Sequence, residues 1–302
     1  MELGYGKPLY ILAFDHRGSF QKKFFGVTGT PSAEEAARIS DAKGVIFEGL
    51  LHALDEGMDR EAAGALVDEQ FGADIARKAK VDGLTLAMPV EKSGQDEFDF
   101  DYGEDFGAHI EQFDPSFSKV LVRFNPEGDA EMNARQAERL KRLSDWLHER
   151  DRRFLFELLV PAEPHQLDAV GGDAAAYDTD VRPGLMRRSI AALQDGGVEP
   201  DIWKIEGIDR REDCGVIAAQ CRSGEGRANV ACVVLGRGAD DAAVDHWLRM
   251  GSGVPGYIGF AIGRTIWWDP LKAYVDGNAG RDEASKRIAA NYRRFVDMYQ
   301  QR

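Results

Sequence analysis

The chain has 302 residues, which is long enough for two average domains or for one large α/β barrel. It carries 38 Lys and Arg residues against 52 Asp and Glu residues, a formal net charge of −14. An acidic protein gains no counterion-release attraction to nucleic acid or to an anionic membrane, so we expect neither as a partner. An anionic ligand must instead be held by a local cationic pocket.

The first twenty residues lack the charged-then-apolar pattern of a signal peptide, and Asp15 interrupts their only apolar run. No run of the sequence is apolar for long enough to span a membrane. Cys214, Cys221 and Cys232 form no C-x-x-C pair, so we expect neither a zinc clip nor a disulfide framework. Such features are typical of a cytoplasmic protein with reduced thiols.

Short apolar runs recur along the chain and predict strands that begin near residues 9, 65, 83, 119, 154, 201, 231 and 257. Helical patterns separate most of these runs. Ser32 and Glu35, for example, form a capping box that opens a helix running to about Gly57. Eight such units predict a single (β/α)8 TIM barrel over residues 1–302, with no internal repeat or linker. A doubly wound open sheet is less favoured, because no G-x-G-x-x-G follows the first strand.

One acidic connection, residues 91–118, follows the third predicted strand and departs from this rhythm. Long connections without a helical pattern are either surface loops or functional lids. We interpret this one as a solvated surface loop rather than a metal site. Its position on the mouth side of the barrel leaves a lid role open.

Charged residues are predicted to point into the barrel, because side chains alternate between the two faces of a strand. Trp203 and Ile205 suit the layer beneath the helices, which turns Lys204 inward, and the same alternation turns Glu157 inward. The interior should also receive Asp15, Lys119, Arg123 and Glu206. Buried charges must pair or change protonation state, so either an inert ion-pair network or a reactive site fills the barrel.

A buried lysine near a second cation and a carboxylate suits Schiff-base chemistry. The amine attacks only after it loses its proton, and both burial and a neighbouring cation lower the pKa of an amine. A neutral amine then adds to a ketone, and a carboxylate assists the loss of water to give a protonated imine. The imine accepts electrons when the carbon–carbon bond beta to it breaks. The pattern therefore predicts a class I aldolase with Lys204 as the nucleophile.

An anion site is predicted at the last two strands. Glycine and arginine residues follow the seventh strand at Gly236, Arg237 and Gly238, and the eighth at Gly263 and Arg264. In TIM barrels these two loops often bind phosphate through backbone N–H groups and a helix N-terminus. Arginine adds a fork of donors that suits phosphate oxygens.

Six motifs occur in the order "FDHRGSF", "KVLVRFNPEGD", "FLFELLVP", "DIWKIEG", "VVLGRG" and "GFAIGRTIWWDPL". Through them nearly the whole chain resembles the aldolase domain of myo-inositol catabolism, and more distantly the tagatose-bisphosphate and other class I aldolases. The resemblance implies cleavage of 2-deoxy-5-keto-gluconate 6-phosphate to dihydroxyacetone phosphate and malonate semialdehyde, without a cofactor. Barrels of this kind commonly self-associate, so a homo-oligomer is expected.

The resemblance also implies residue roles, with Lys204 as the imine-forming lysine and Glu157 as the proton shuttle. It matches Asp15 to the aspartate that ends the first strand, where it would take the proton of the substrate hydroxyl. Lys119 matches the lysine of the fourth strand, which helps to keep the nucleophile neutral. Lys119 lies near the start of its strand, so Arg123 is the alternative cation. His16 stands where the tagatose relatives carry an amide, which indicates a different substrate.

Several alternatives stay open. Arg123, Lys92 or Arg17 is a candidate for binding a substrate carboxylate, while Asp68 and Gln70 either order hydroxyls or serve the fold. The six histidines are scattered, so no metal site is predicted. The rival functions are a class I aldolase for another ketose or sulfosugar phosphate and a sugar-phosphate-binding barrel without turnover.

Overall fold

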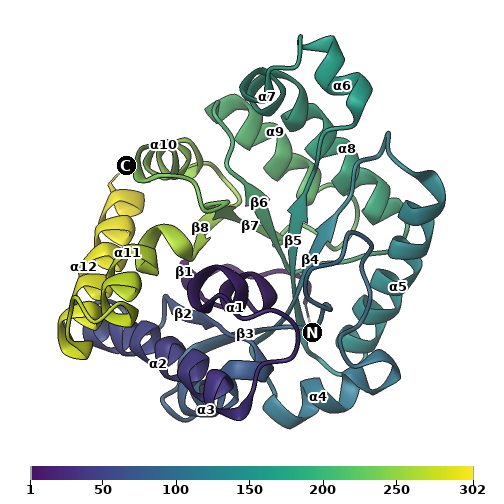
Figure 1. Ribbon diagram of the computed structural model, residues 1–302. Coiled ribbons are helices and arrows are strands. Elements are labelled where there is room, and N and C mark those ends of the chain that lie inside the picture. The colour runs from purple at the N-terminus through teal and green to yellow at the C-terminus, as the bar shows by residue number, and fades with distance from the viewer. Residues whose placement is uncertain (1, 302) are drawn as a thin grey trace.

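The computed structural model describes residues 2–301 and forms a closed barrel of parallel strands in the order β1 to β8 (Figure 1). The strands are β1 (Leu9–Ala13), β2 (Ala63–Leu66), β3 (Thr85–Pro89), β4 (Phe117–Arg123), β5 (Arg153–Leu159), β6 (Ile202–Glu206), β7 (Ala231–Leu235) and β8 (Tyr257–Ile262). Each predicted apolar run overlaps one strand. The prediction of a (β/α)8 TIM barrel is confirmed.

Helices surround the strands on the outside of the barrel (Figure 1). The longer ones are α2 (Ala33–Asp55), α3 (Glu69–Val81), α5 (Ala130–His148), α8 (Arg182–Asp195), α9 (Arg211–Cys221), α10 (Asp241–Gly251), α11 (Arg264–Val275) and α12 (Arg281–Gln300). Shorter helical segments are α1 (Gly18–Phe25), α4 (Phe106–Phe113), α6 (Pro164–Ala169), α7 (Ala174–Ala176), the 3-10 turn η1 (Gly103–Asp105) and the π-helical η2 (Tyr177–Val181). No helix within residues 2–301 has both the length and the apolar character needed to cross a membrane.

Two apolar clusters follow from the alternation of side chains along the strands. The outer cluster lies between strands and helices and includes Trp203, Ile205 and Phe154, as the alternation predicts. The inner cluster fills the barrel with Leu9, Ile11, Ala13, Leu66, Ala87, Phe117, Leu155, Ile202, Ala231, Val233 and Ala261. Phe117, Leu155 and Ile202 each stand two residues before an inward-facing charged residue of the same strand, which is Lys119, Glu157 or Lys204. The amino-terminal part of the barrel is therefore an apolar plug beneath a charged layer.

Residues 91–118 are more ordered than the sequence indicates, so their interpretation as a solvated loop is wrong in large part. The segment contains α4, and Phe98 and Phe100 are buried, with Phe100 stacked on Phe106 at 4.3 Å between ring centroids. Its acidic residues pair with arginines of α5: Glu97 with Arg135 and Arg139, and Glu104 with Arg142. The buried aromatic side chains pack this segment against the rest of the protein, which its acidic composition does not indicate.

Helices α2 and α12 pack closely, side by side at the edge of the barrel (Figure 1). A Cβ atom on Gly49 would lie 2.5 Å from Cγ2 and 2.7 Å from Cβ of Ile288. Contacts this short are not tolerated between carbon atoms, and the Cβ of a β-branched residue cannot rotate away. Glycine at this position therefore sets the distance between the first and last long helices.

We expect Gly49→Ala to destabilise the protein by about 1–3 kcal/mol, because the added methyl group overpacks this helix contact. Urea denaturation would measure the loss. Gly184→Ala is the matched control, since Gly184 lies in α8 and a methyl group added there would meet no neighbouring side chain within 4 Å in residues 2–301. The control should be neutral or slightly stabilising, because alanine favours helix more than glycine does. Equal effects of the two substitutions would contradict the packing argument.

Candidate active site

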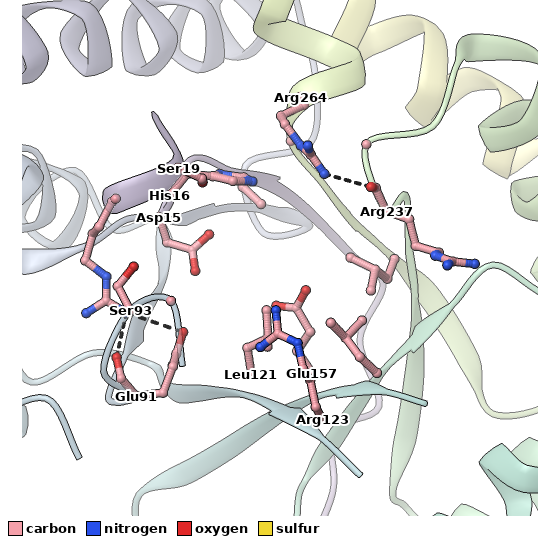
Figure 2. A pocket seen from close by; sticks show the side chains of 18 of the residues that line it. Asp15, His16, Ser19, Glu91, Ser93, Leu121, Arg123, Glu157, Arg237 and Arg264 are labelled. Atoms are coloured by element: carbon pink, nitrogen blue, oxygen red, sulfur yellow. Dashed lines mark hydrogen bonds and ion pairs between the residues drawn. The ribbon is translucent and has the colours of Figure 1, made fainter. Parts of the chain in front are cut away.

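A charged layer lies on top of the apolar plug, at the carboxyl ends of the strands. Lys119, Glu157, Lys204 and Glu206 are all buried, with at most 6% of each residue exposed. Together with Asp15 they line one cavity of about 1120 Å³ at the mouth of the barrel (Figure 2). The active-site side of TIM barrels is this same face. The inward orientation predicted from strand alternation is therefore what the structure has.

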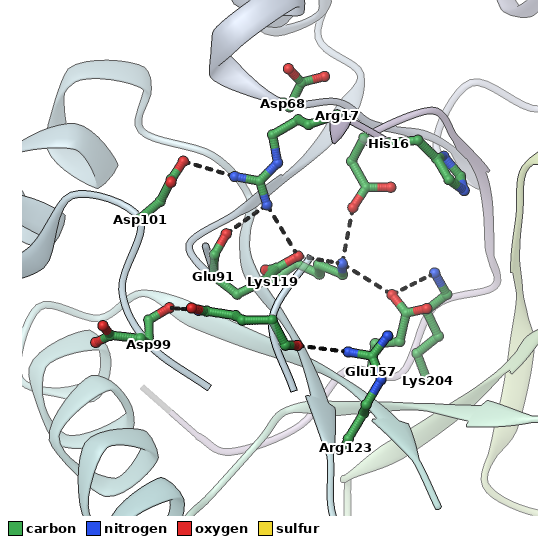
Figure 3. A network of polar contacts seen from close by, with 12 residues as sticks. His16, Arg17, Asp68, Glu91, Asp99, Asp101, Lys119, Arg123, Glu157 and Lys204 are labelled. Carbon is green, nitrogen blue, oxygen red and sulfur yellow. Dashed lines mark hydrogen bonds and ion pairs between the residues drawn. The ribbon is translucent and has the colours of Figure 1, made fainter. Parts of the chain in front are cut away.

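Glu157 lies between two lysines (Figure 3). Its Oε2 atom accepts a hydrogen bond from Nζ of Lys204 at 2.9 Å and is 3.1 Å from Nζ of Lys119. The register brings this about, because Glu157 and Lys204 are directly paired on β5 and β6. Burial alone would raise the pKa of Glu157, but the charges of Lys119 and Lys204 outweigh it and hold the pKa below its usual range.

Lys119 reaches the centre of the site even though it stands third in β4. Its Nζ donates to Asp15 Oδ2 at 2.9 Å and to Glu91 Oε1 at 2.8 Å, in addition to its contact with Glu157. Burial would lower the pKa of Lys119, but the three carboxylates raise it well above its usual value. Lys119 is therefore a fully protonated cation whose charge is offset locally, which weakens its expected influence on Lys204.

Asp15 is held in place from two directions. Beyond its ion pair with Lys119, the backbone on either side of it is fixed by Lys43, whose Nζ donates to the carbonyls of Phe14 and His16. Burial would raise the pKa of Asp15, but the charge of Lys119 dominates and lowers it, helped by His16 and Lys204. Asp15 thus faces the cavity as a carboxylate on a braced loop.

Asp68 has a structural role in this bracing. Its carboxylate caps α3 by accepting from Phe71 N at 2.9 Å, and it pairs with the fully buried Lys43. It is therefore not available to order substrate hydroxyls. Gln70, the other candidate of that pair, lines the cavity.

Glu91, the partner of Arg17, is a part of the site that the sequence did not predict. Arg17 is only 6% exposed, and its guanidinium contacts the Glu91 carbonyl, the Glu91 carboxylate at 3.5 Å and Asp101 at 2.8 Å. Burial raises the pKa of Glu91. The Arg17 guanidinium already pairs with two carboxylates, which disfavours Arg17 as the residue that binds a substrate carboxylate. The position of Glu91 could have indicated its role, because it stands two residues after the end of β3, at the edge of the cavity.

His16 lies beside this cluster with its ring edge-on against Trp267 at 5.6 Å between centroids. Burial lowers the pKa of His16 to about 4, against the opposing effect of Asp15. The ring is therefore neutral near pH 7. Its Nδ1 is buried without a hydrogen-bond partner in residues 2–301.

The two loops predicted to bind phosphate both line the cavity (Figure 2). Arg264 begins α11 directly after Gly263, and its Nη2 donates to the Arg237 carbonyl at 2.7 Å. A Cβ on Gly238 would lie 2.2 Å from the Arg264 guanidinium and would have to displace it, and the positive φ of 71° at Gly238 also favours glycine. The side chain of Arg264 and the backbone of the neighbouring glycines together line one side of the cavity.

Arg237 is oriented differently from expectation. Its side chain pairs with Asp178 at 2.7 Å and with the buried Glu206 at 3.1 Å. Burial would lower the pKa of Arg237, but these two acids raise it. The Arg237 guanidinium is committed to carboxylates, so only its backbone remains as an element of the predicted phosphate loop.

Arg123 and Lys92 lie at the other side of the cavity. The Nη1 atom of Arg123 donates to the Gln95 carbonyl at 2.9 Å, and the guanidinium lines the cavity. Lys92 is exposed and also lines the cavity. Both therefore remain positioned to meet a ligand.

No group of three or more His, Cys, Asp or Glu residues within residues 2–301 has the arrangement of a metal site. The space enclosed by Asp15, Glu91 and Glu157 is occupied by the ammonium group of Lys119. The three cysteines are free and buried.

Comparison with known proteins places the chain in a family. The model of the family described as "Uncharacterized protein conserved in bacteria (DUF2090)" matches residues 5–302. The chain belongs to the DUF2090 family. No curated protein matches it.

Solved structures similar to this DUF2090 chain share its fold. One is a Schiff base-forming fructose-1,6-bisphosphate aldolase, with 14% identity over 95% of this chain and 94% of that one and a TM-score of 0.55. Another is Cgl0159 from Corynebacterium glutamicum (Brevibacterium flavum), with 17% identity over 96% of this chain and 88% of that one and a TM-score of 0.58. At these identities the likeness concerns the fold.

We expect Lys119→Met to destabilise this DUF2090 protein by about 3–5 kcal/mol at pH 7, because it leaves Asp15, Glu91 and Glu157 buried around an apolar chain. In the native protein the pKa values of Asp15 and Glu157 are lowered, so their pairing stabilises the fold above about pH 4 and is lost on acidification. In the variant the buried carboxyls should have raised pKa values, so the stability deficit should shrink toward pH 4. Urea denaturation at both pH values measures it.

Lys141→Met supplies the control, since this exposed lysine pairs with Asp145 on the surface of α5. An exposed ion pair contributes little, and the control should be nearly neutral at either pH. A deficit for Lys119→Met that is independent of pH would contradict the electrostatic explanation.

Proposed function

We propose that the protein is a class I aldolase that forms a Schiff base through Lys204 and cleaves a phosphorylated keto sugar acid. The observation that carries the proposal is the contact between the buried Lys204 amine and Glu157 on the floor of the cavity. Imine chemistry requires an amine and a proton-transfer group within hydrogen-bond reach of one another, and both must face the substrate. The charged layer meets these requirements.

The first steps concern Lys204 and Glu157. Transfer of a proton along their 2.9 Å hydrogen bond gives a neutral amine and a carboxylic acid. The two lysines lower the pKa of Glu157, so this transfer is uphill and is drawn forward when the amine attacks the substrate ketone. Glu157 then gives its proton to the carbinolamine hydroxyl, which leaves as water. The product is a protonated imine on Lys204.

Bond cleavage concerns Asp15. Its carboxylate accepts the proton of the hydroxyl two carbons from the imine carbon, and the C–C bond between the hydroxyl-bearing carbon and its neighbour on the imine side breaks. The electron pair moves into the imine to give an enamine, while the hydroxyl carbon becomes the aldehyde. Protonation of the enamine carbon and hydrolysis of the imine release the ketone product and restore Lys204. The lowered pKa of Asp15 keeps it ionised but makes it a weak base, so the proton transfer is coupled to cleavage of the C–C bond.

The phosphate end of the substrate is assigned to the loops after β7 and β8. Gly238 and Gly263 present backbone at the cavity, Arg264 supplies a guanidinium, and α11 directs its N-terminus toward the same side. Arg264 has no carboxylate partner within residues 2–301, unlike Arg237. A phosphate bound there would place an adjacent ketone near the lysine of β6.

The proposed substrate is 2-deoxy-5-keto-gluconate 6-phosphate, cleaved to dihydroxyacetone phosphate and malonate semialdehyde. Its support is the resemblance of the six sequence motifs to the aldolase domain of myo-inositol catabolism. The fold shared with a Schiff base-forming aldolase is compatible with this chemistry, although it extends to the scaffold alone.

We expect dihydroxyacetone phosphate and borohydride to inactivate the enzyme and to add the reduced ligand to the peptide that contains Lys204. Peptide mass spectrometry locates the adduct. Lys204→Met should remain folded and acquire no adduct there. Glu157→Gln should slow imine formation by about 10²- to 10⁴-fold, since it removes the acid that expels water. A chelator should change none of these results.

Two results would contradict the proposal. An adduct on another lysine in place of Lys204 would remove the nucleophile, and inactivation that a chelator prevents would indicate metal-dependent chemistry. A coupled assay across keto acid phosphates and ketose bisphosphates then identifies the substrate. Imine formation without cleavage of any of them would identify a binding protein rather than an aldolase.

A further inference from the structure

Two arginines that line the cavity have no buried carboxylate partner within residues 2–301, and they lie across the barrel from each other. In the closed order β1 to β8, β4 and β8 are four strands apart in either direction, and β6 lies midway between them. Arg264 follows β8, and Arg123 is the last residue of β4. In Figure 2 these arginines enter the cavity from opposite sides, with Asp15 and Glu157 between them.

Four of the eight lysines and arginines that line the cavity are already neutralised by carboxylates. Arg17 is paired with Glu91 and Asp101, and Arg237 with Asp178 and Glu206. Lys119 has three carboxylate partners and Lys204 has one. Neutralised cations gain little from a further anion, because its charge would repel the carboxylates already present.

Arg123 differs from these residues. Within residues 2–301 its only side-chain hydrogen bond is from Nη1 to the Gln95 carbonyl, and Nη2 has no partner. The nearest carboxylate oxygen, on Asp96, is 4.0 Å from Nε, and that side chain is 96% exposed. A pair so open to water offsets little charge. The Gln95 carbonyl therefore orients the guanidinium and leaves donors for a ligand.

We propose that Arg123 binds the carboxylate at the end of the substrate opposite the phosphate. The proposal rests on the proposed function and deepens it, because it assigns the substrate class to a pair of anionic ends. The acid group belongs to the fragment that leaves as an aldehyde. Arg123 is thus a specificity-determining residue that acts on the whole substrate but not on the ketone fragment alone.

Arginine on a strand end suits this task better than Lys92. The planar guanidinium matches the two oxygens of a carboxylate, and its direction is fixed by Gln95 and by the end of β4. Lys92 is an exposed residue on a loop, with a hydrated point charge on a flexible stem. A second phosphate would present the same anionic chemistry, so the experiment must separate a carboxylate from a phosphate.

The test compares two reactions of the same variants. With Arg123→Met, kcat/KM for cleavage of the keto acid phosphate should fall about 10- to 100-fold, chiefly through KM, as expected for loss of a charge-assisted contact. Borohydride trapping of dihydroxyacetone phosphate on Lys204 should stay within about twofold of wild type, because this fragment has no carboxylate. Arg123→Lys should recover part of the cleavage. Arg264→Met should instead weaken trapping.

Arg77→Met is the matched control, an exposed arginine of α3 paired with Asp74, and it should leave both reactions unchanged. Equal loss of trapping and cleavage in Arg123→Met, or a loss that falls on Lys92→Met instead, overturns the assignment. If the enzyme cleaves a ketose bisphosphate but not the keto acid phosphate, and that cleavage depends on Arg123, then Arg123 binds a second phosphate and the assignment of a carboxylate is wrong. Wild-type protein that traps no ketone overturns the proposed function itself.

Discussion

The shared carboxylate of Glu157 is the interaction on which the rest of the site depends. One oxygen contacts two buried ammonium groups, at 2.9 Å from Lys204 and 3.1 Å from Lys119. Neither lysine could be buried unpaired, since an isolated charge in the interior costs several kcal/mol. The other acids of the site meet the same requirement. Because Glu157 is shared between two lysines, Lys119 also pairs with Asp15 and Glu91.

Such a layer is tolerated because the barrel separates it from the apolar core. The inner plug of residues such as Ile11, Leu155 and Ile202 closes the amino-terminal side, and the charges meet the cavity on the other. Every second side chain of a strand points inward, so one strand can supply an apolar residue to the plug and a charged residue to the layer above it. In β4, β5 and β6, stability and chemistry are thereby divided along one strand rather than among separate elements.

Period-two alternation was sufficient to predict much of this arrangement from sequence. It placed Lys204 and Glu157 inside and Trp203 outside, because a large apolar side chain in a parallel barrel belongs beneath the helices. It could not predict the role of Glu91 or the pairing of Arg237 with Asp178 and Glu206, since Glu91, Asp178 and Arg237 lie outside the strands, where no period of two governs side-chain direction. Side-chain pairing in loops depends on tertiary contacts that a local pattern does not contain.

The electrostatic balance also explains why the cluster can respond to a ligand at Lys204. Asp15, Glu91 and Glu157 face Lys119, Lys204 and Arg17, so the fully ionised group is close to neutral. When Lys204 loses its proton, the cluster carries excess negative charge unless one of the carboxylates accepts that proton. Glu157 is the acid in direct contact, and Glu91, whose pKa burial raises, is a second acceptor across Lys119. Lys119 therefore connects the acids whose charge must change when the amine becomes a nucleophile.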